Sequence, residues 1–209
     1  FSIIKTIAAG NHKLSKIATS LEIKQTGLTK YLKTLIDLDI LEREVPITED
    51  MPEKSKRGLY KIKDNFLNFW FKFVYPNLNY IERGNEDIVE KKIRANLIDN
   101  HVSYIYEDIC LEEMWQLSAE GKWGFHFNKA GRWWNNNTEI DIVAFDVSGN
   151  NIIFGECKFW GSKVGIDTFY SLVEKTREVE WKRNERQELY VFFSISGFTD
   201  EMMELAKKR

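Results

Sequence analysis

Two apolar segments joined by a polar turn constrain the fold of this 209-residue chain more than any other feature. Residues 138–146 and 151–160 have the composition of strands, and the turn at 147–151 joins them as a hairpin. Each segment is apolar on both faces, which is typical of a central strand that is covered on both sides. The sequence therefore predicts a layered α/β core built around residues 138–160.

Three charged residues lie inside these apolar strands, away from the ends of the first: Asp141 in the first, and Glu156 and Lys158 in the second. An unpaired charge inside a sheet is costly, so each of them needs a partner or a function. Glu156 and Lys158 are two positions apart and point to the same face, whereas Cys157 points away. Because the hairpin turn is tight, we expect Asp141 beside them, so that two carboxylates converge with one ammonium group.

This grouping suits metal-assisted hydrolysis of a phosphodiester. Carboxylate oxygens of Asp141 and Glu156, with the backbone carbonyl of Cys157, can hold magnesium or manganese. Such a metal would polarise the phosphate and lower the pKa of a bound water, while Lys158 could orient that water or stabilise transition-state charge. The alternative is a structural salt bridge of Lys158 with one carboxylate, which leaves the other carboxylate unbalanced.

The rest of the back half predicts the order helix, three strands, helix, strand. The expected helices and strands outside the hairpin are a helix over 101–117 with Ile109 on its apolar side, a strand over 123–128, a helix over 167–182, a strand over 188–194 and a helix over 200–209. Trp133 and Trp134 are expected in a polar loop before the Asp141 strand. There they could stack on bases, or they could close a core or an interface.

The first 63 residues predict three short helices followed by a two-stranded hairpin. Apolar stripes at 1–7, 14–21 and 28–36 indicate the helices, and residues 41–45 and 58–63 indicate the strands. This order is that of a winged helix-turn-helix domain. These residues carry 12 Lys and Arg against 8 Asp and Glu, whereas the remainder is acidic with a net charge of −6. A basic front and an acidic back favour nucleic acid as the partner of the front.

Residues 14–41 resemble the helix-turn-helix of winged-helix regulators, with Glu22 at the turn position where such motifs usually have glycine. The polar side of the third helix and the wing loop supply the candidate DNA contacts, which are Gln25, Thr26, Thr29, Lys30 and Lys33 from the helix and Lys54, Lys56 and Arg57 from the loop. The same helix face could instead be merely solvated, or the domain could dock a protein.

The middle of the chain, residues 64–100, predicts bridging helices. Residues 66–75 are aromatic and apolar nearly all round, which is typical of a helix buried between two domains. Residues 85–98 predict a surface helix. No apolar run approaches the roughly 20 residues that a membrane span needs, and two cysteines without metal-ligand spacing favour a reduced, cytoplasmic setting. The chain begins Phe-Ser-Ile-Ile without methionine, so we expect a longer protein upstream.

The pattern Glu139-Ile-Asp141, followed by Phe154-Gly-Glu156-Cys-Lys158, resembles the PD-(D/E)XK nuclease superfamily and its Holliday-junction-resolvase-like branch. The resemblance implies a restriction-endonuclease-like fold in which Asp141 and Glu156 bind the metal and Lys158 is catalytic. Glu107, on the preceding helix, matches an additional metal-binding carboxylate of some members. Glu139 matches an acidic residue often found two positions before the aspartate, and isoleucine replaces the proline of the motif.

With residues 58–74 as a bridge, nearly the whole chain resembles the C-terminal half of archaeal-type ATPases, which are AAA-class P-loop proteins. The resemblance implies a nucleotide-binding module upstream of this chain. ATP would bind only to that module, because this chain has no Gly-x-x-x-x-Gly-Lys-Ser/Thr motif.

The expected architecture is therefore α/β, with a winged helix-turn-helix domain over 1–63, bridging helices over 64–100 and a three-layer, restriction-endonuclease-like domain with a mixed central sheet over 101–209. The expected function is that of a deoxyribonuclease module that depends on magnesium or manganese. Its expected partners are DNA and the upstream ATPase domain. No membrane association is expected, and the oligomeric state stays open. The alternative is an inactive nuclease-fold module that binds DNA or protein and regulates that ATPase.

Overall fold

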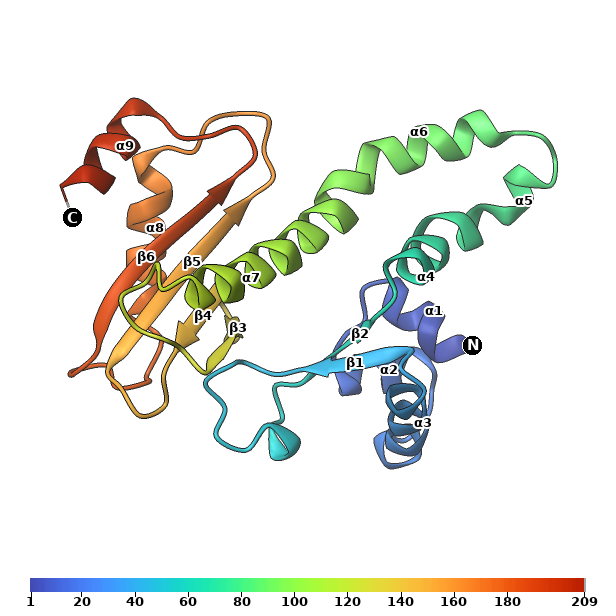
Figure 1. The fold of residues 1–209 in the computed structure, drawn as a ribbon. Helices are drawn as coiled ribbons and strands as arrows, with labels where there is room; N and C mark the ends of the chain where they lie inside the picture. Colours follow the sequence, from blue (N-terminus) through green and yellow to red (C-terminus); the bar gives the residue numbers. More distant parts are fainter. Residues whose placement is uncertain (209) are drawn as a thin grey trace. The chain divides into compact units, whose positions relative to one another are not determined.

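The computed structural model describes residues 1–208 and divides the chain into two compact units (Figure 1). The first unit contains residues 1–45 and 49–101. The second contains Pro46–Thr48 and the chain from Val102 onward. The helices of residues 64–100 thus belong to the first unit, and the small segment around Ile47 belongs to the second, where the Ile47 N–H donates to the Arg132 carbonyl at 2.9 Å.

The first unit begins with three helices and a hairpin, as the apolar spacing predicted. Their bounds are α1 Ser2–Ala8, α2 Leu14–Ser20, α3 Gln25–Asp37, β1 Leu41–Glu44 and β2 Leu59–Ile62. The two strands pair antiparallel, with Leu41 opposite Ile62. Ile7, Ile17 and Leu28, one from each helix, are at most 1% exposed and form a common core with Leu41 of the hairpin. The order of elements is therefore confirmed.

The helices that follow are interrupted rather than continuous. They are α4 Asn65–Phe69, a π-helical turn over Trp70–Val74, a 3-10 turn over Tyr75–Asn77, α5 Leu78–Ile81, α6 Glu86–Leu97 and a second π-helical turn over Ile98–Val102. The prediction that the aromatic segment is buried all round is wrong: Phe71 and Phe73 are buried, but Phe66 is 67% exposed. The reason is that this short helix packs its Leu67, Trp70 and Phe71 side against the core of α1–α3, which leaves the opposite side to solvent.

The turn between α2 and α3 contains a strained residue. Glu22 has a φ of +55°, in the left-handed region that glycine adopts without steric cost. A residue with a Cβ atom is destabilised by about 1–2 kcal/mol in this region, and glycine avoids that strain. Glycine is also more flexible in the unfolded chain, which offsets part of its advantage.

We therefore expect Glu22→Gly to stabilise the first unit by about 0.5–1 kcal/mol, measured by urea unfolding. Glu22→Ala is the matched control, because it removes the same carboxylate but keeps the Cβ atom. Equal effects of the glycine and alanine variants would show that backbone strain at residue 22 is not what limits this turn.

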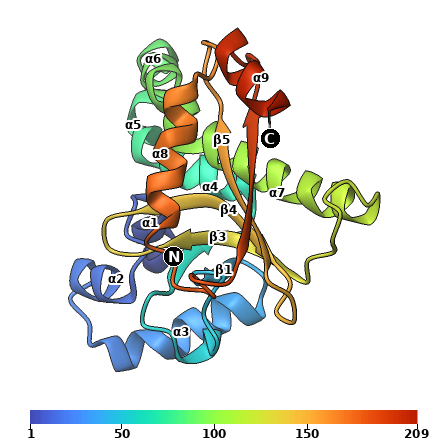
Figure 2. The ribbon, with the colours of Figure 1, turned by 90° about the vertical axis from the view of Figure 1, so that its left-hand side faces the viewer.

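The second unit is a four-stranded mixed sheet with helices on both faces (Figure 2). Its elements are α7 Ser103–Ala119, β3 Lys129–Trp134, β4 Glu139–Phe145, β5 Asn151–Lys158, α8 Ile166–Thr176, β6 Gln187–Ser194 and α9 Asp200–Lys207. The strand order is β3-β4-β5-β6, in which β6 runs parallel to β5 and the other pairs are antiparallel. The predicted mixed sheet and the predicted hairpin are both confirmed.

Each face of the sheet has its own core. Met114 of α7 packs with Ile142 and Ile153 on one face. Leu172 of α8 packs with Val143 and Phe154 on the other. All six of these side chains are fully buried. The central strands are therefore covered on both sides, as their continuous apolar runs indicate.

The position of the first strand of this sheet was predicted wrongly. Residues 123–128 contain no strand, and β3 lies at Lys129–Trp134. Trp133 and Trp134 are 4% and 7% exposed within β3, not in a loop. The polar run that suggested a loop is the turn after the strand, where the Asn135 side chain accepts the N–H groups of residues 137 and 138 at 2.8 Å. The bulk of the two indoles is buried by the sheet instead.

Two helix predictions also need correction. The helix expected over 167–182 ends at Thr176, where the Arg186 guanidinium donates to the Thr176 carbonyl at 2.8 Å and to the Trp181 carbonyl, beyond the helix, at 3.0 Å. Ile109 is 56% exposed, because the buried stripe of α7 runs through Cys110, Met114 and Ser118 instead.

In the described part of the chain, no helix is both long and apolar enough to cross a membrane.

Candidate active site

A β-bulge determines where Asp141 lies. The register of β3 with β4 shifts between Gly131↔Val143 and Trp133↔Ile140. Two residues of β4, Asp141 and Ile142, therefore lie opposite Arg132 alone. Bulges bend a strand and redirect a side chain, and they are common beside active sites.

Asp141 also marks the end of the β4–β5 ladder. Ile142↔Gly155 is the last backbone pair, and the N–H of Cys157 then donates to Asp141 Oδ2 at 2.8 Å. The two strands lie close here, since a Cβ atom on Gly155 would come within 2.9 Å of Ile142 Cβ. The Asp141 carboxylate thus serves as a side-chain acceptor directly beside the β5 backbone.

Glu156 holds two ammonium groups inside the protein. It is 4% exposed, and its Oε1 accepts from Lys158 Nζ at 2.6 Å. Lys175 Nζ donates to both oxygens of the same carboxylate at 3.0 Å. Lys158 and Lys175 retain 18% and 28% exposure of their side chains, so the cluster reaches the surface.

Lys175 comes from α8 and was missed in the sequence. Its signal is its position three residues after the buried Leu172, which places it on the side of α8 that faces the sheet. Glu156 and Lys158 therefore point toward α8. Cys157 packs with Cys110 and Met114 of α7 on the other face, so the predicted alternation along β5 is confirmed.

The two carboxylates, Asp141 and Glu156, differ in their electrostatic surroundings. Burial, followed by the nearby charge of Glu156, raises the pKa of Asp141 to about 6, although the Cys157 N–H and the two lysines act in the opposite direction. Both ammonium groups bond to Glu156, while Asp141 is held by a neutral N–H. Additional positive charge beside Asp141 would relieve this unfavourable burial.

The donor set fits a hard divalent cation. Magnesium commonly binds through one or two carboxylates and completes its shell with water and substrate phosphate, and Asp141 and Glu156 supply two such carboxylates on neighbouring strands. A cation here would share Glu156 with the two ammonium groups. Within residues 1–208, no set of three or more His, Cys, Asp or Glu side chains is grouped to hold a metal ion.

A second ion cluster lies at the bulge. Arg132 is only 9% exposed, pairs with Glu139 and lies 3.4 Å from Glu107 Oε2, and the Tyr104 ring lies 5.7 Å from the guanidinium carbon. The structure thus places Glu107 and Glu139, both suggested by resemblance, against Arg132. Arg132 itself was missed, because its part of the sequence was taken for a loop.

The candidate DNA contacts of the first unit are all exposed. On α3, these are Gln25, Thr26, Thr29, Lys30 and Lys33, and in the wing loop they are Lys54, Lys56 and Arg57. Thr29 Oγ1 donates to the Gln25 carbonyl at 3.0 Å, and Arg57 pairs with Glu49 at 2.6 Å. The wing arginine is thus partly neutralised, whereas Lys30 and Lys33 on α3 are exposed and present their charge to solvent.

Comparisons with known proteins cover most of the chain. A family model described as archaeal and bacterial proteins of unknown function, DUF234, matches residues 70–189. An uncharacterized protein of Methanocaldococcus jannaschii is 41% identical over 157 residues, which are 75% of this chain and 35% of the relative. The chain therefore spans about a third of the length of this curated relative. No solved structure matches significantly.

Proposed function

The chain belongs to the DUF234 family of archaeal and bacterial proteins of unknown function, and we propose that its second unit is a divalent-metal-dependent nuclease module that hydrolyses DNA phosphodiesters. The observation that carries this proposal is the convergence of Asp141, Glu156 and Lys158 at the end of the β4–β5 ladder, with Asp141 left short of positive charge. The proposed fold of this unit is restriction-endonuclease-like.

The residues divide the proposed chemistry among them. Asp141 and Glu156, with the carbonyl of Cys157, would hold magnesium or manganese. When bound, such an ion polarises a phosphate and lowers the pKa of a bound water. Lys158, which donates to Glu156 Oε1 at 2.6 Å, lies beside the proposed metal site and would donate to the charge that develops on the phosphate.

Two lysines on one carboxylate give the site a further property. Lys175 bonds both oxygens of Glu156, so Lys158 can turn toward a substrate without leaving Glu156 unpaired. An unpaired buried carboxylate would destabilise the protein by several kcal/mol. Because Lys175 keeps Glu156 paired, Lys158 can move at a much smaller cost in free energy. We assign Lys158 as the catalytic lysine and Lys175 as a positioning residue.

The test combines metal binding with cleavage. Calorimetric titration of the chain with magnesium or manganese should show binding that Asp141→Asn removes. Single-stranded, double-stranded and branched DNA should each be offered with the metal, and cleavage of at least one is expected. Absence of divalent-ion binding by the unmodified chain would overturn the nuclease proposal.

A second candidate keeps the fold but not the catalysis. Residues 64–209 carry a net charge of −6, whereas a nuclease usually presents positive surface to DNA. In this alternative the second unit binds DNA or protein and regulates an ATPase domain upstream of it. The resemblance to archaeal-type ATPases suggests such a domain, and the relative is long enough to contain one, since the matched region covers 35% of it. Metal binding without cleavage of any DNA by the longer protein would favour it.

For the first unit we propose a winged helix-turn-helix that contacts DNA through α3. Changing Lys30 and Lys33 together to alanine should weaken DNA binding and reduce the slope of log K against log[salt] by about 2, if each lysine meets a phosphate. Fluorescence anisotropy over a salt series measures this. Changing the exposed Lys91 and Lys122 to alanine alters the net charge equally and should leave the slope unchanged. If both pairs behave alike, α3 is not the DNA contact.

A further inference from the structure

Strand β6 has the sequence of a central strand but lies at the edge of the sheet. Its residues 189–193 read Leu-Tyr-Val-Phe-Phe, yet each of them is only partly buried. Residues 152–157 of β5, its neighbour, are all buried. β6 ends the strand order, so among residues 1–208 no strand pairs with its outer side (Figures 1 and 2). A long apolar edge of this kind is a template for pairing with another chain.

The backbone of β6 determines which residues face outward. The N–H groups of Gln187 and Ile195 donate to the carbonyls of Asn150, just before β5, and Lys158, at its end, so the odd-numbered residues of β6 direct their backbone groups toward β5. The even-numbered residues from Glu188 to Ser194 then direct theirs to the open edge. An antiparallel partner strand must match even-numbered residues with even-numbered residues.

The polarity of the strand is symmetric about Val191. Residues 188–194 consist of five apolar residues between two polar ones, Glu188 and Ser194. If a second copy pairs antiparallel with Val191 on the twofold axis, Tyr190 meets Phe192 of the partner subunit, and both are even-numbered. Glu188 meets Ser194 of the partner subunit, so no like charges face each other. A twofold interface requires this self-complementarity.

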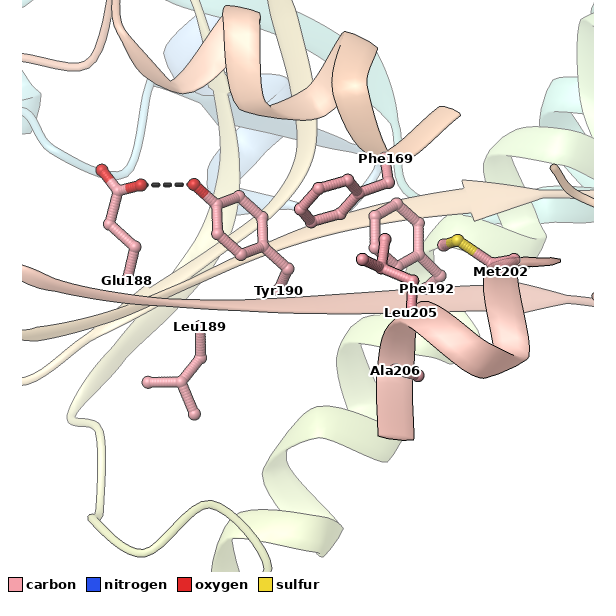
Figure 3. A pocket seen from close by; sticks show the side chains of 8 residues that line it. All are labelled: Phe169, Glu188, Leu189, Tyr190, Phe192, Met202, Leu205 and Ala206. Atoms are coloured by element: carbon pink, nitrogen blue, oxygen red, sulfur yellow. Dashed lines mark hydrogen bonds between the residues drawn. The ribbon is translucent and has the colours of Figure 1, made fainter. Parts of the chain in front are cut away.

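Glu188 is already neutralised within its own chain. Its carboxylate accepts from Arg186 Nε at 2.7 Å and from the Tyr190 hydroxyl, as the dashed line in Figure 3 shows. The edge therefore carries little net charge along its length. An uncharged, apolar strand edge suits an identical strand better than DNA or a strongly charged protein.

An open apolar pocket continues this surface. It has a volume of about 290 Å³ and lies between α8, β6 and α9, with Phe169, Tyr190, Phe192 and Met202 around it (Figure 3). In the Val191-centred register, the two Tyr190–Phe192 aromatic pairs fall on this face of the extended sheet. Cross-strand aromatic pairs each contribute up to about 1 kcal/mol.

From these observations we infer that β6 is an interface between two copies of this chain, which join antiparallel about Val191 into one eight-stranded sheet. The inference does not depend on the proposed nuclease activity. It also accounts for the sequence of β6, because pairing would give the strand the burial that its apolar residues already have in β5.

Sedimentation and crosslinking of the 209-residue chain test the interface. The unmodified chain should sediment at twice 24.7 kDa. Val191→Cys should form a covalent dimer under mild oxidation, because a non-hydrogen-bonded antiparallel pair has Cα atoms about 4.5 Å apart, within disulfide range. Glu180→Cys, on an exposed turn, is the matched control and should crosslink far more slowly. The native Cys110 and Cys157 are buried and contribute no background.

A charge-swap mixture tests the twofold axis itself. Val191→Lys and Val191→Glu should each be monomeric, since like charges then meet, and an equal mixture of the two should restore the dimer. A monomeric unmodified chain would overturn the inference, and so would a Val191→Cys variant that crosslinks no faster than Glu180→Cys. The crosslinking result decides the question even if the charged variants fold poorly.

Discussion

Asp141→Asn is expected to stabilise the chain at neutral pH, whereas Glu156→Gln is expected to destabilise it. Asp141 is a buried carboxylate beside a second one, and asparagine removes its charge but still accepts the Cys157 N–H. Glu156 is the partner of two ammonium groups, and glutamine leaves both without a counter-charge. Breaking a buried ion pair in this way costs about 3–5 kcal/mol.

The effect at Asp141 depends on pH in a defined direction. Its pKa is about 6 in the folded chain against an ordinary value of 3.8, so the folded state binds more protons than the unfolded state between these values. The free energy of unfolding therefore falls as the pH rises from about 4 to about 6, by roughly 3 kcal/mol at most. Asp141→Asn should be more stable than the parent by up to this amount at pH 7 and equal to it below pH 4.

Urea unfolding of the parent and both variants at several pH values measures these differences. A magnesium or manganese series provides the control, because the added ion should raise the stability of the parent and have little effect on Asp141→Asn. A purely structural ion cluster predicts the same order of stabilities without metal, but no rise in the stability of the parent when magnesium or manganese is added. That outcome would remove the main support for a metal site.

Lys158→Ala is expected to abolish most cleavage while leaving metal binding intact. A donor that stabilises transition-state charge is typically worth about 10²–10³ in rate. Lys175 still pairs with both oxygens of Glu156 in this variant, so the fold and the carboxylates should be retained. Single-turnover cleavage measures the loss, and calorimetry confirms that the ion still binds.

Lys175→Ala is the matched comparison, since it removes an ammonium group from the same carboxylate. Lys158 is then needed to hold Glu156, so we expect a smaller loss of rate together with weaker metal affinity. Lys175→Arg should recover part of that affinity. If Lys175→Ala loses as much rate as Lys158→Ala with metal affinity unchanged, the two roles have been assigned the wrong way round.

The local sequence was sufficient for the features that depend on neighbouring residues. Period-two alternation placed Glu156 and Lys158 on one face and Cys157 on the other, and the tight turn at 147–151 specified an antiparallel hairpin. Helical spacing likewise identified α1–α3, α6 and α7 within a few residues. These patterns are readable because backbone geometry repeats over two to four residues, so the pattern of burial repeats with it.

The boundaries of several elements depended on contacts from farther along the chain. Arg186 binds the carbonyl of Thr176, the last residue of α8, and the carbonyl of Trp181 beyond it. Trp133 and Trp134 form a strand next to a polar turn, because β4 offers a pairing partner and the sheet buries both indoles. Neither effect leaves a periodic signal in the segment that it changes.

The chemistry of the candidate site shows the same division. Asp141, Glu156 and Lys158 are visible in the sequence, because a charge inside an apolar strand departs from its surroundings. Lys175 and Arg132 resemble ordinary surface residues in the sequence, and they become part of buried clusters only when α8 packs on β5 and Arg132, at the bulge, meets Glu107 of α7. Ion pairing acts through space, between groups whose separation along the chain is unrelated to their distance, so only the packed structure decides which charges meet.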